Sequence, residues 1–247
     1  MTKQLLQQPL LWSVLLLAAC VMALPYATPL FASLFPKLDR PLYTQEPFAW
    51  LLWQHVLLVG ASSLFSVLTG TAVGFTITRS SGQSFRPLIE NLLATSQAFP
   101  PVAVLALAVP VVGFGELPAL LALALYGLLP VVQGTVSGLQ GVPAPQRQAA
   151  LSLGLTGSQC LCSIEIPLAL PVWLSGVRTS VIINIGTAAI ASTVGAKTLG
   201  SPIIVGLSGF NTAYVLQGAI VLALLAVTVD LSFECFARHL ERWREVL

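Results

Sequence analysis

The chain has 247 residues, of which 56% are hydrophobic and 8% charged, with a formal net charge of +2. A soluble domain has about 25% charged residues, so this composition excludes a water-exposed globular protein and indicates an integral membrane protein. The small net charge and the lack of a long basic run argue against a nucleic-acid partner. The four cysteines, at 20, 160, 162 and 235, are too scattered for a disulfide framework or a metal site.

Long intervals with few charges divide the chain into membrane spans. A helix needs about 20 apolar residues to cross the hydrocarbon core. The intervals predict an all-α fold, a polytopic membrane helical bundle forming a single domain over residues 1–247. The predicted spans lie near 10–35, 49–77, 91–113, 117–140, 168–195 and 203–231. The first run is too long for a signal peptide and has prolines where cleavage would be expected, so we expect a retained span.

The positions of Lys and Arg predict the orientation. With the N-terminus in the cytoplasm, eight of the 11 Lys and Arg residues lie on the inner side and three on the outer side. The inner ones are Lys3, Arg79, Arg86, Arg147, Arg178, Arg238, Arg242 and Arg244, and the outer ones are Lys37, Arg40 and Lys197. Because cytoplasmic connections are enriched in these residues, we expect both termini and the loop 141–166 to be cytoplasmic.

The loop 141–166 contains signals for two short helices. Prolines at 143 and 145 favour a first helical turn, so Gln146–Leu153 is predicted to be helical, and Gly154 fits a left-handed stop. Thr156 to Gln159 has the spacing of a capping box, which predicts a second helix start. We therefore expect a helix–turn–helix along the inner surface of the membrane.

Ala149 and Ala150 would give the first of these helices a face with almost no side chains. Two interpretations remain open. Such a face could be a docking element that another protein approaches closely. Alternatively, the loop could be an amphipathic connector lying on lipid headgroups.

Polar groups at membrane depth are costly and are therefore candidates for function. The candidates for a translocation pathway are Ser96, Gln97, Phe99, Pro100, Asn184 and Thr187. The paired prolines after Phe99 break the helical hydrogen-bond ladder and expose carbonyls. Carbonyls, neutral amides and an aromatic ring suit a bulky cation that donates no hydrogen bonds. The alternative, that these residues only pack helices together, remains open.

His55 is expected to form an interhelical hydrogen bond rather than to relay protons.

The stretch from Gln148 to Pro167 has a regular spacing: Gln-Ala-Ala, three residues, Gly, nine residues, Ile, one residue, Ile-Pro. This spacing resembles the EAA loop of ABC-transporter inner-membrane permeases, which has Glu-Ala-Ala at the start and Leu-Pro at the end. Gln148 lacks the charge of that Glu but keeps its hydrogen-bonding ability. The resemblance implies a coupling helix that contacts an ATPase subunit through Gln148, Ala149, Ala150, Gly154, Ile164 and Pro167.

Two further stretches resemble one group of ABC-transporter permeases in particular. NLLATSQAFPPVAVLALAVPVVGFG at 91–115 and RTSVIINIGTAAIASTVGAKTLGSPII at 178–204 look like the permeases of osmoprotectant importers. These carry glycine betaine, choline, carnitine and related quaternary ammonium compounds under osmotic stress. Lys197-Thr198 departs from the Gly-Gly pair frequent in that group, and adds a cation on the predicted outer side.

The resemblance implies a type I importer permease in the bacterial cytoplasmic (inner) membrane, working with several partners. These would be a pair of ATP-binding subunits that use ATP and Mg, a second permease chain (identical or different) and an extracytoplasmic solute-binding protein. The chain has no Gly-x-x-x-x-Gly-Lys-Ser/Thr phosphate loop and no nucleophile–base set, so we expect no enzyme activity, catalytic residue, cofactor or metal site of its own. The alternatives are an amino acid or another small solute as cargo, and a structural membrane subunit that transports nothing.

Overall fold

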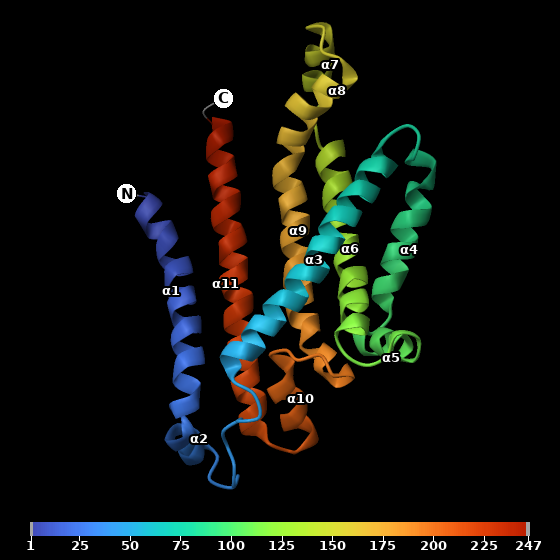
Figure 1. The fold of residues 1–247 in the computed structure, drawn as a ribbon. Coiled ribbons are helices and arrows are strands. Elements are labelled where there is room, and N and C mark those ends of the chain that lie inside the picture. The colour runs from blue at the N-terminus through green and yellow to red at the C-terminus, as the bar shows by residue number, and fades with distance from the viewer. Residues whose placement is uncertain (1, 246–247) are drawn as a thin grey trace. The chain divides into compact units, whose positions relative to one another are not determined.

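The computed structural model describes the backbone of residues 2–245 and the side chains of residues 9–240. Within residues 2–245 the regular secondary structure is helical, apart from an isolated bridge between Gly115 and Gly195. The α-helices (Figure 1) are α1 Thr2–Ala23, α2 Thr28–Leu34, α3 Phe48–Thr78, α4 Arg86–Ala98, α5 Pro101–Val112, α6 Glu116–Gln140, α7 Ala144–Ser152, α8 Gly157–Cys160, α9 Ile166–Ala188, α10 Gly200–Ser208 and α11 Thr212–Glu245. Shorter helical turns cover Leu24–Tyr26, Gln83–Phe85, Leu161–Glu165 and Ile190–Val194.

Five helical segments among the described residues are long and apolar enough to cross a membrane: Pro9–Tyr26, Phe48–Thr78, Glu116–Gln140, Gly157–Ala188 and Thr212–Leu240. A sixth span results if the bent pair Gln83–Ala98 and Pro101–Val112 counts as one. The predicted all-α membrane bundle of about six spans is confirmed.

The interval 91–113, which we expected to be one span, is divided in the structure. α4 ends at Ala98, and α5 begins at Pro101. Phe99 and Pro100 between them are extended, with ψ of 136° and 138°. A residue before proline avoids the α region, and neither proline can donate a helical hydrogen bond, so two consecutive prolines end the helix here.

The last two predicted spans also have different bounds. α9 follows α8 and the π-helical turn Leu161–Glu165 without a gap, so the second short helix of the loop continues into the fifth span. The interval 203–231 is divided, because α10 ends at Ser208 and α11 begins at Thr212. Asn211 precedes α11, and its Oδ1 accepts a hydrogen bond from the backbone N–H of Tyr214 at 3.2 Å. This side-chain cap defines a new helix start that hydropathy does not reveal.

Contacts divide the chain into two compact units. The expected single permease domain over residues 1–247 stays a prediction. The first unit comprises Met1–Ser62, Pro100–Leu123 and Ile182–Phe236, and the second comprises Ser63–Phe99, Ala124–Val181 and Ala237–Leu247. The long helices α3, α6, α9 and α11 each contribute to both units.

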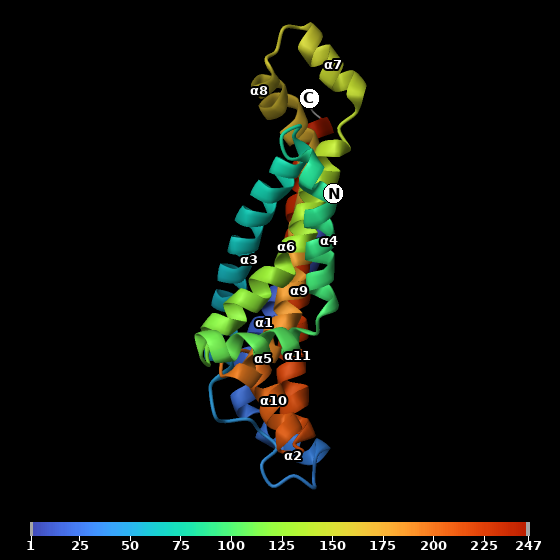
Figure 2. The same ribbon diagram turned by 90° about the vertical axis from the view of Figure 1, so that its right-hand side faces the viewer.

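In the second unit, three parts of the chain pack around an apolar cluster of Ile77, Val132 and Val136. Side chains of α3 and α4, among them Val73 and Ile89, cover this cluster. α6 and α9 approach each other closely at Gly134 and Gly176, where an added Cβ on Gly176 would lie 2.9 Å from the Gly134 Cα. α7 and α8 lie beyond the ends of α6 and α9 (Figures 1 and 2). The loop 141–166 therefore projects from the end of a helical pair with closely packed backbones.

In the first unit, buried polar side chains join segments that are distant in sequence. Gln217 of α11 is fully buried; its Nε2 donates to the carbonyl of Pro41, and its Oε1 accepts from the backbone N–H of Tyr43 at 3.1 Å. His55 of α3 is also fully buried, and its Nδ1 accepts from the backbone N–H of Leu199 at 3.3 Å. The expected structural hydrogen bond of His55 is confirmed, between α3 and the segment that leads into α10.

Candidate functional site

The loop 141–166 forms the first short helix that the sequence predicts. α7 begins after Pro143, whose φ of −62° and ψ of 134° are extended, and has a proline in its first turn. The helix ends at Ser152, and Gly154 follows with a φ of +87°. The helix and the left-handed glycine stop are confirmed, because a residue with a side chain is strained at this φ.

The second helix start is confirmed as well. The Thr156 hydroxyl accepts from the Gln159 backbone N–H at 3.4 Å, and the Thr156 backbone N–H donates to Gln159 Oε1 at 2.8 Å. Each of these bonds satisfies a donor that would otherwise lack a partner at the helix start. This reciprocal pair fixes the direction in which the chain enters α8.

The residues with the EAA-like spacing differ in exposure. Gln148, Ala149 and Gly154 are exposed, as is Pro167, and Ile164 is half-buried. Ala150 is buried at 4% exposure, and its carbonyl accepts from the backbone N–H of Leu155 at 3.2 Å. The expectation that both alanines form an open face is wrong for Ala150, which packs inside the loop. A partner that docks on α7 would meet Gln148 and Ala149.

A buried carboxylate, Glu165, connects several segments of this region. Glu165 is 9% exposed, and its Oε2 accepts from Arg79 Nη2 at 2.9 Å. Arg147 Nε lies 3.2 Å from Oε1 of the same carboxylate, and Arg147 Nη2 donates to the carbonyl of Leu139. Glu165 thus links the end of α3, the helix α7 and the start of α9, and Arg147 extends this link to the end of α6. Its position between Ile164 and Ile166 gave only a weak signal, because an isolated Glu beside a span is usually an interface charge.

The predicted pathway residues at the break after α4 are held by one tyrosine. Gln97 Nε2 donates to the Tyr126 carbonyl at 2.9 Å, and the Tyr126 hydroxyl donates to the carbonyl of Phe99. Ser96 donates to the Leu93 carbonyl of its own helix at 2.7 Å. The Phe99 ring is 52% exposed. The structure therefore brings Gln97 and Phe99 together through Tyr126, a residue that no sequence motif marks.

The other three pathway candidates belong to the first unit. Asn184 is fully buried in α9, Thr187 of the same helix is half-buried, and Pro100 is exposed at the start of α5. Their roles in transport stay a prediction.

The second unit contains an apolar cavity of about 280 Å³. Its lining residues come from α3, α6 and α9 and are Thr71, Phe75, Thr135, Leu139, Ile166, Ala169, Leu170 and Trp173. Trp173 Nε1 donates to the Thr71 hydroxyl at 2.9 Å, which fixes the indole at the cavity wall. The cavity has no charged lining residue, and its lining is apolar or aromatic apart from Thr71 and Thr135.

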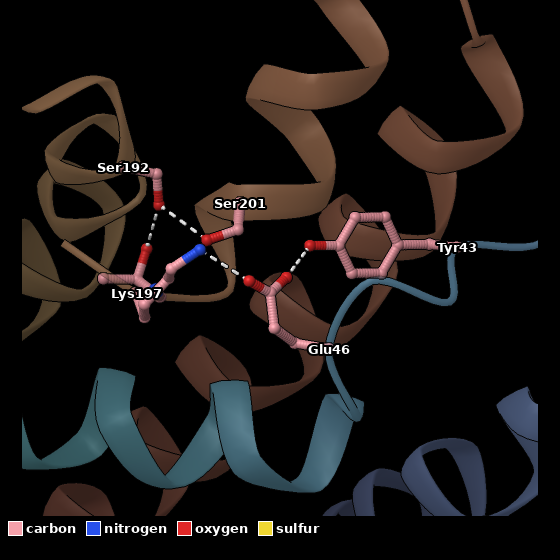
Figure 3. Close-up of polar contacts among 6 residues, drawn as sticks. Tyr43, Glu46, Ser192, Lys197 and Ser201 are labelled. Carbon is pink, nitrogen blue, oxygen red and sulfur yellow. Dashed lines mark hydrogen bonds and ion pairs between the residues drawn. The ribbon is translucent and has the colours of Figure 1, made fainter. Parts of the chain in front are cut away.

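The first unit contains a polar cluster around Lys197 (Figure 3). Lys197 Nζ donates to Glu46 Oε1 at 2.5 Å, and the Tyr43 hydroxyl donates to Glu46 Oε2. The neighbouring Ser192 Oγ lies 3.2 Å from Ser201 Oγ. Tyr43 also packs edge-on against the rings of two further residues, Phe48 and Tyr214.

The ionisation of this cluster follows from its contacts. Burial raises the pKa of the Tyr43 phenol, and the hydrogen bond to Glu46 raises it further. For Glu46 burial acts upward, but the hydrogen bonds from Lys197 and Tyr43 and the Lys197 charge outweigh it, so the pKa of the carboxyl falls below its ordinary value. Glu46 is therefore a carboxylate, and Tyr43 its neutral donor, at physiological pH.

Comparison with known proteins identifies the family. Residues 66–246 match the family of binding-protein-dependent transport system inner membrane components. The chain belongs to this family. The protein is therefore the transmembrane permease subunit of an ABC importer. The permease subunits of this family are not themselves enzymes.

Among curated members of this family, the chain is similar to permeases of osmoprotectant importers. The chain is 37% identical over 196 residues to the osmoprotectant import permease protein OsmY of Salmonella typhimurium, covering 79% of this chain and 83% of OsmY. It is 32% identical over 178 residues to the choline transport system permease protein OpuBB of Bacillus subtilis, covering 72% of this chain and 81% of OpuBB. The predicted resemblance to osmoprotectant permeases is confirmed at the level of sequence.

Solved structures of the ABC transporter family have the same fold. An inward-facing structure of the MetNI methionine ABC transporter matches with a TM-score of 0.69 at 20% identity, covering 80% of this chain and 99% of that one. At this identity the match concerns the fold alone. Together with the apolar helices, the family assignment makes the protein a multi-pass inner-membrane protein.

Proposed function

We propose that this permease forms the pathway for quaternary ammonium osmoprotectants such as glycine betaine, choline and carnitine. Curated relatives at 30–37% identity are named as osmoprotectant, choline or carnitine permeases, which supports this cargo. The structural likeness to a methionine transporter concerns the fold alone and does not favour an amino acid.

We further propose that a separate ATPase subunit docks on α7 and supplies the energy from ATP and Mg. The observation that carries this proposal is the exposure of Gln148 and Ala149 on a loop that projects beyond the ends of α6 and α9. A helix face with a small side chain allows the backbone of a partner to approach closely. The complete assembly would contain two ATPase subunits, two permease chains and a solute-binding protein outside the membrane.

The proposed orientation places both termini and α7 in the cytoplasm. Eight of the 11 Lys and Arg residues are then on the inner side, as the positive-inside rule requires. Cysteine labelling at position 149 from either side of sealed vesicles tests this orientation, with Cys162, which is exposed, replaced by Ser. Labelling at 149 from the outside only would contradict both the orientation and the docking of a cytoplasmic ATPase.

The direct test is transport by the purified complex. The permease is isolated with the proteins that bind it in native membranes and is reconstituted in liposomes. Uptake of radiolabelled glycine betaine, choline, carnitine and methionine is then measured with and without ATP. We expect ATP-dependent uptake of one or more quaternary amines, and methionine uptake alone would show that the cargo is wrong. Isolation without any ATPase, or ATP hydrolysis without uptake of any solute, would favour a structural subunit.

An α7 variant separates docking from folding. Ala149→Arg places a large cation on the exposed face of α7, so we expect loss of ATPase binding with an unchanged melting temperature. Gln140→Arg, at the exposed end of α6 outside the EAA-like spacing, is the matched control and should bind the ATPase normally. Normal ATPase binding by Ala149→Arg would exclude this face as the docking site.

A further inference from the structure

The second unit connects the loop 141–166 to helix α3 through a polar contact between residues 86 positions apart. The loop is covalently joined to α6 at its start and to α9 at its end, but no covalent connection joins it to α3. Arg79 directly follows the last residue of α3, and its Nη2 lies 2.9 Å from Glu165 Oε2. The pair therefore provides a direct link between the loop and a third helix.

We infer that the Arg79–Glu165 pair is a tether that transmits movement of the α7 loop to α3 during transport, with Glu165 as a positioning residue for coupling. This inference rests on the proposed docking of an ATPase on α7. It adds a defined route from the docking face to one membrane helix. Neither residue belongs to the EAA-like spacing.

The surroundings of Glu165 favour a rigid contact. Its side chain is 11% exposed, whereas the Arg79 and Arg147 side chains are 34% and 35% exposed. A buried carboxylate with a guanidinium on each oxygen is held from two sides, and loss of one partner leaves a buried charge with fewer partners. The planar guanidinium also fixes the geometry of the contact better than an ammonium group would.

Contacts on both sides of the carboxylate fit a transmitting role. Arg147 belongs to α7 itself, only one residue before Gln148, and also donates to the Leu139 carbonyl at the end of α6. The Arg79 guanidinium carbon lies 4.6 Å from the centre of the Phe75 ring, one turn earlier in the chain. Arg79 is thus held against α3 and Arg147 against α6 and α7, with Glu165 between them. A displacement of α7 would pull on Glu165 and, through it, on Arg79.

The test uses the complete reconstituted complex and compares Arg79→Gln with Arg86→Gln. Arg86 lies at the start of α4 in the same unit and pairs at 2.8 Å with Glu90 of its own helix, so it has a similar ion pair that does not reach the loop. We measure uptake of the quaternary amine that the wild-type complex transports, the rate of ATP hydrolysis and their ratio. We expect Arg79→Gln to retain the ATPase and hydrolyse ATP, but to import at least fivefold less solute per ATP than Arg86→Gln.

Three further variants separate the tether from a merely structural role. Glu165→Gln should lose at least as much coupling as Arg79→Gln, because it also removes the ion pair with Arg147. The double variant Arg79→Gln with Glu165→Gln should import no less solute per ATP than the more impaired single variant, because each substitution already removes the Arg79–Glu165 contact. Arg79→Lys keeps the charge and should restore part of the solute imported per ATP. A purely structural role would instead lower assembly and leave the coupling ratio of the assembled complexes unchanged.

The outcomes distinguish this inference from the proposed function. A wild-type complex that imports quaternary amines with ATP, combined with a normal coupling ratio in Arg79→Gln, would overturn the tether alone. Failure of both Arg79→Gln and Glu165→Gln to assemble, with Arg86→Gln intact, would also overturn it in favour of a structural role. A wild-type complex without an ATPase would instead overturn the proposed function on which the tether rests.

Discussion

Lys197 Nζ lies 2.5 Å from Glu46 Oε1, so the segment between Ile190–Val194 and α10 is bonded to the loop that precedes α3. The Glu46 side chain is 18% exposed and the Lys197 side chain 52%. The Tyr43 hydroxyl donates to the second oxygen of the same carboxylate. The contact joins residues 151 positions apart, both within the first unit. Lys197, the cation expected on the outer side, therefore has a defined partner in Glu46.

The first prediction concerns the stability of this contact. Lys197→Ala removes a partly exposed ion pair, which typically contributes about 0.2–1 kcal/mol. For a chain of this size we expect the melting temperature of the purified protein in detergent to fall by about 1–3 °C. Lys37→Ala, which removes an exposed cation from the α2–α3 connection, is the control and should leave the melting temperature unchanged. An equal change in both variants would mean that the Glu46 contact contributes nothing.

The second prediction is the pH dependence of the same contact. The folded protein lowers the Glu46 pKa below its ordinary value of 4.5, so the stabilisation is fully present above pH 4.5. It is lost as the pH falls through the lowered pKa, where Glu46 takes up a proton. We expect the difference in melting temperature between wild type and Lys197→Ala to be constant from about pH 7 to 5 and to shrink below 4.5. A Glu46→Gln background should abolish this pH dependence, and a difference that persists unchanged there would contradict the assignment to Glu46.

The third prediction concerns the contact of α6 and α9. A Cβ added at Gly176 would lie 2.5 Å from the Pro130 carbonyl oxygen, which is backbone and cannot move aside as a side chain can. We therefore expect Gly176→Ala to destabilise the protein by about 1–3 kcal/mol, because the helices must separate. Gly186→Ala on the same helix meets nothing within 4 Å. It should be neutral or stabilise by up to about 1 kcal/mol, since alanine favours a helix. Melting temperatures in detergent measure both, and similar values for the two variants would exclude a close α6–α9 contact.

The sequence predicted those parts of the fold that depend on local chemistry. The length of the apolar runs predicted the helical segments. Pro143 and Gly154 predicted where α7 begins and where it stops, and the spacing from Thr156 to Gln159 predicted the capping box. Each of these follows from a few neighbouring residues. The broken third span was only half foreseen: the paired prolines were recognised as a break, yet the interval was counted as one span, because hydropathy averages over the two residues that interrupt it.

Contacts between distant residues were not predictable in this way. Glu165 was recognisable only as a charge near a span, and its two arginine partners lie 86 and 18 residues earlier in the chain. Ala149 and Ala150 are chemically identical, and only the three-dimensional turn of the loop shows that one is exposed and the other buried. Tyr126 lies within an apolar run, so nothing in the sequence connects it with Phe99.

The fourth prediction concerns the loop stop at Gly154. Its φ is +87°, and no atom lies within 4 Å of an added Cβ. A substitution there therefore strains the backbone conformation but causes no clash with a neighbouring atom. A residue with a Cβ in the left-handed region costs about 1–2 kcal/mol, and asparagine tolerates that region better than alanine. We expect Gly154→Ala to weaken binding of the ATPase subunit by about tenfold, which corresponds to about 1.4 kcal/mol. Gly154→Asn should bind more tightly than Gly154→Ala, and the reverse order would show that the left-handed conformation is not required.

The fifth prediction concerns the helix break after α4. The backbone N–H groups of Ala103 and Val104 both donate to the Pro100 carbonyl, and the Tyr126 hydroxyl donates to the carbonyl of Phe99. Tyr126→Phe removes this donor without changing the size of the ring, so we expect a loss of about 0.5–1.5 kcal/mol in stability. Because the Phe99 carbonyl then lacks this fixed donor at the break, solute uptake should fall more than ATP hydrolysis. Tyr26→Phe, at a side chain that is 83% exposed, is the control for loss of a phenol hydroxyl. Equal melting temperatures and uptake rates for the two variants would show that Tyr126 does not support the break.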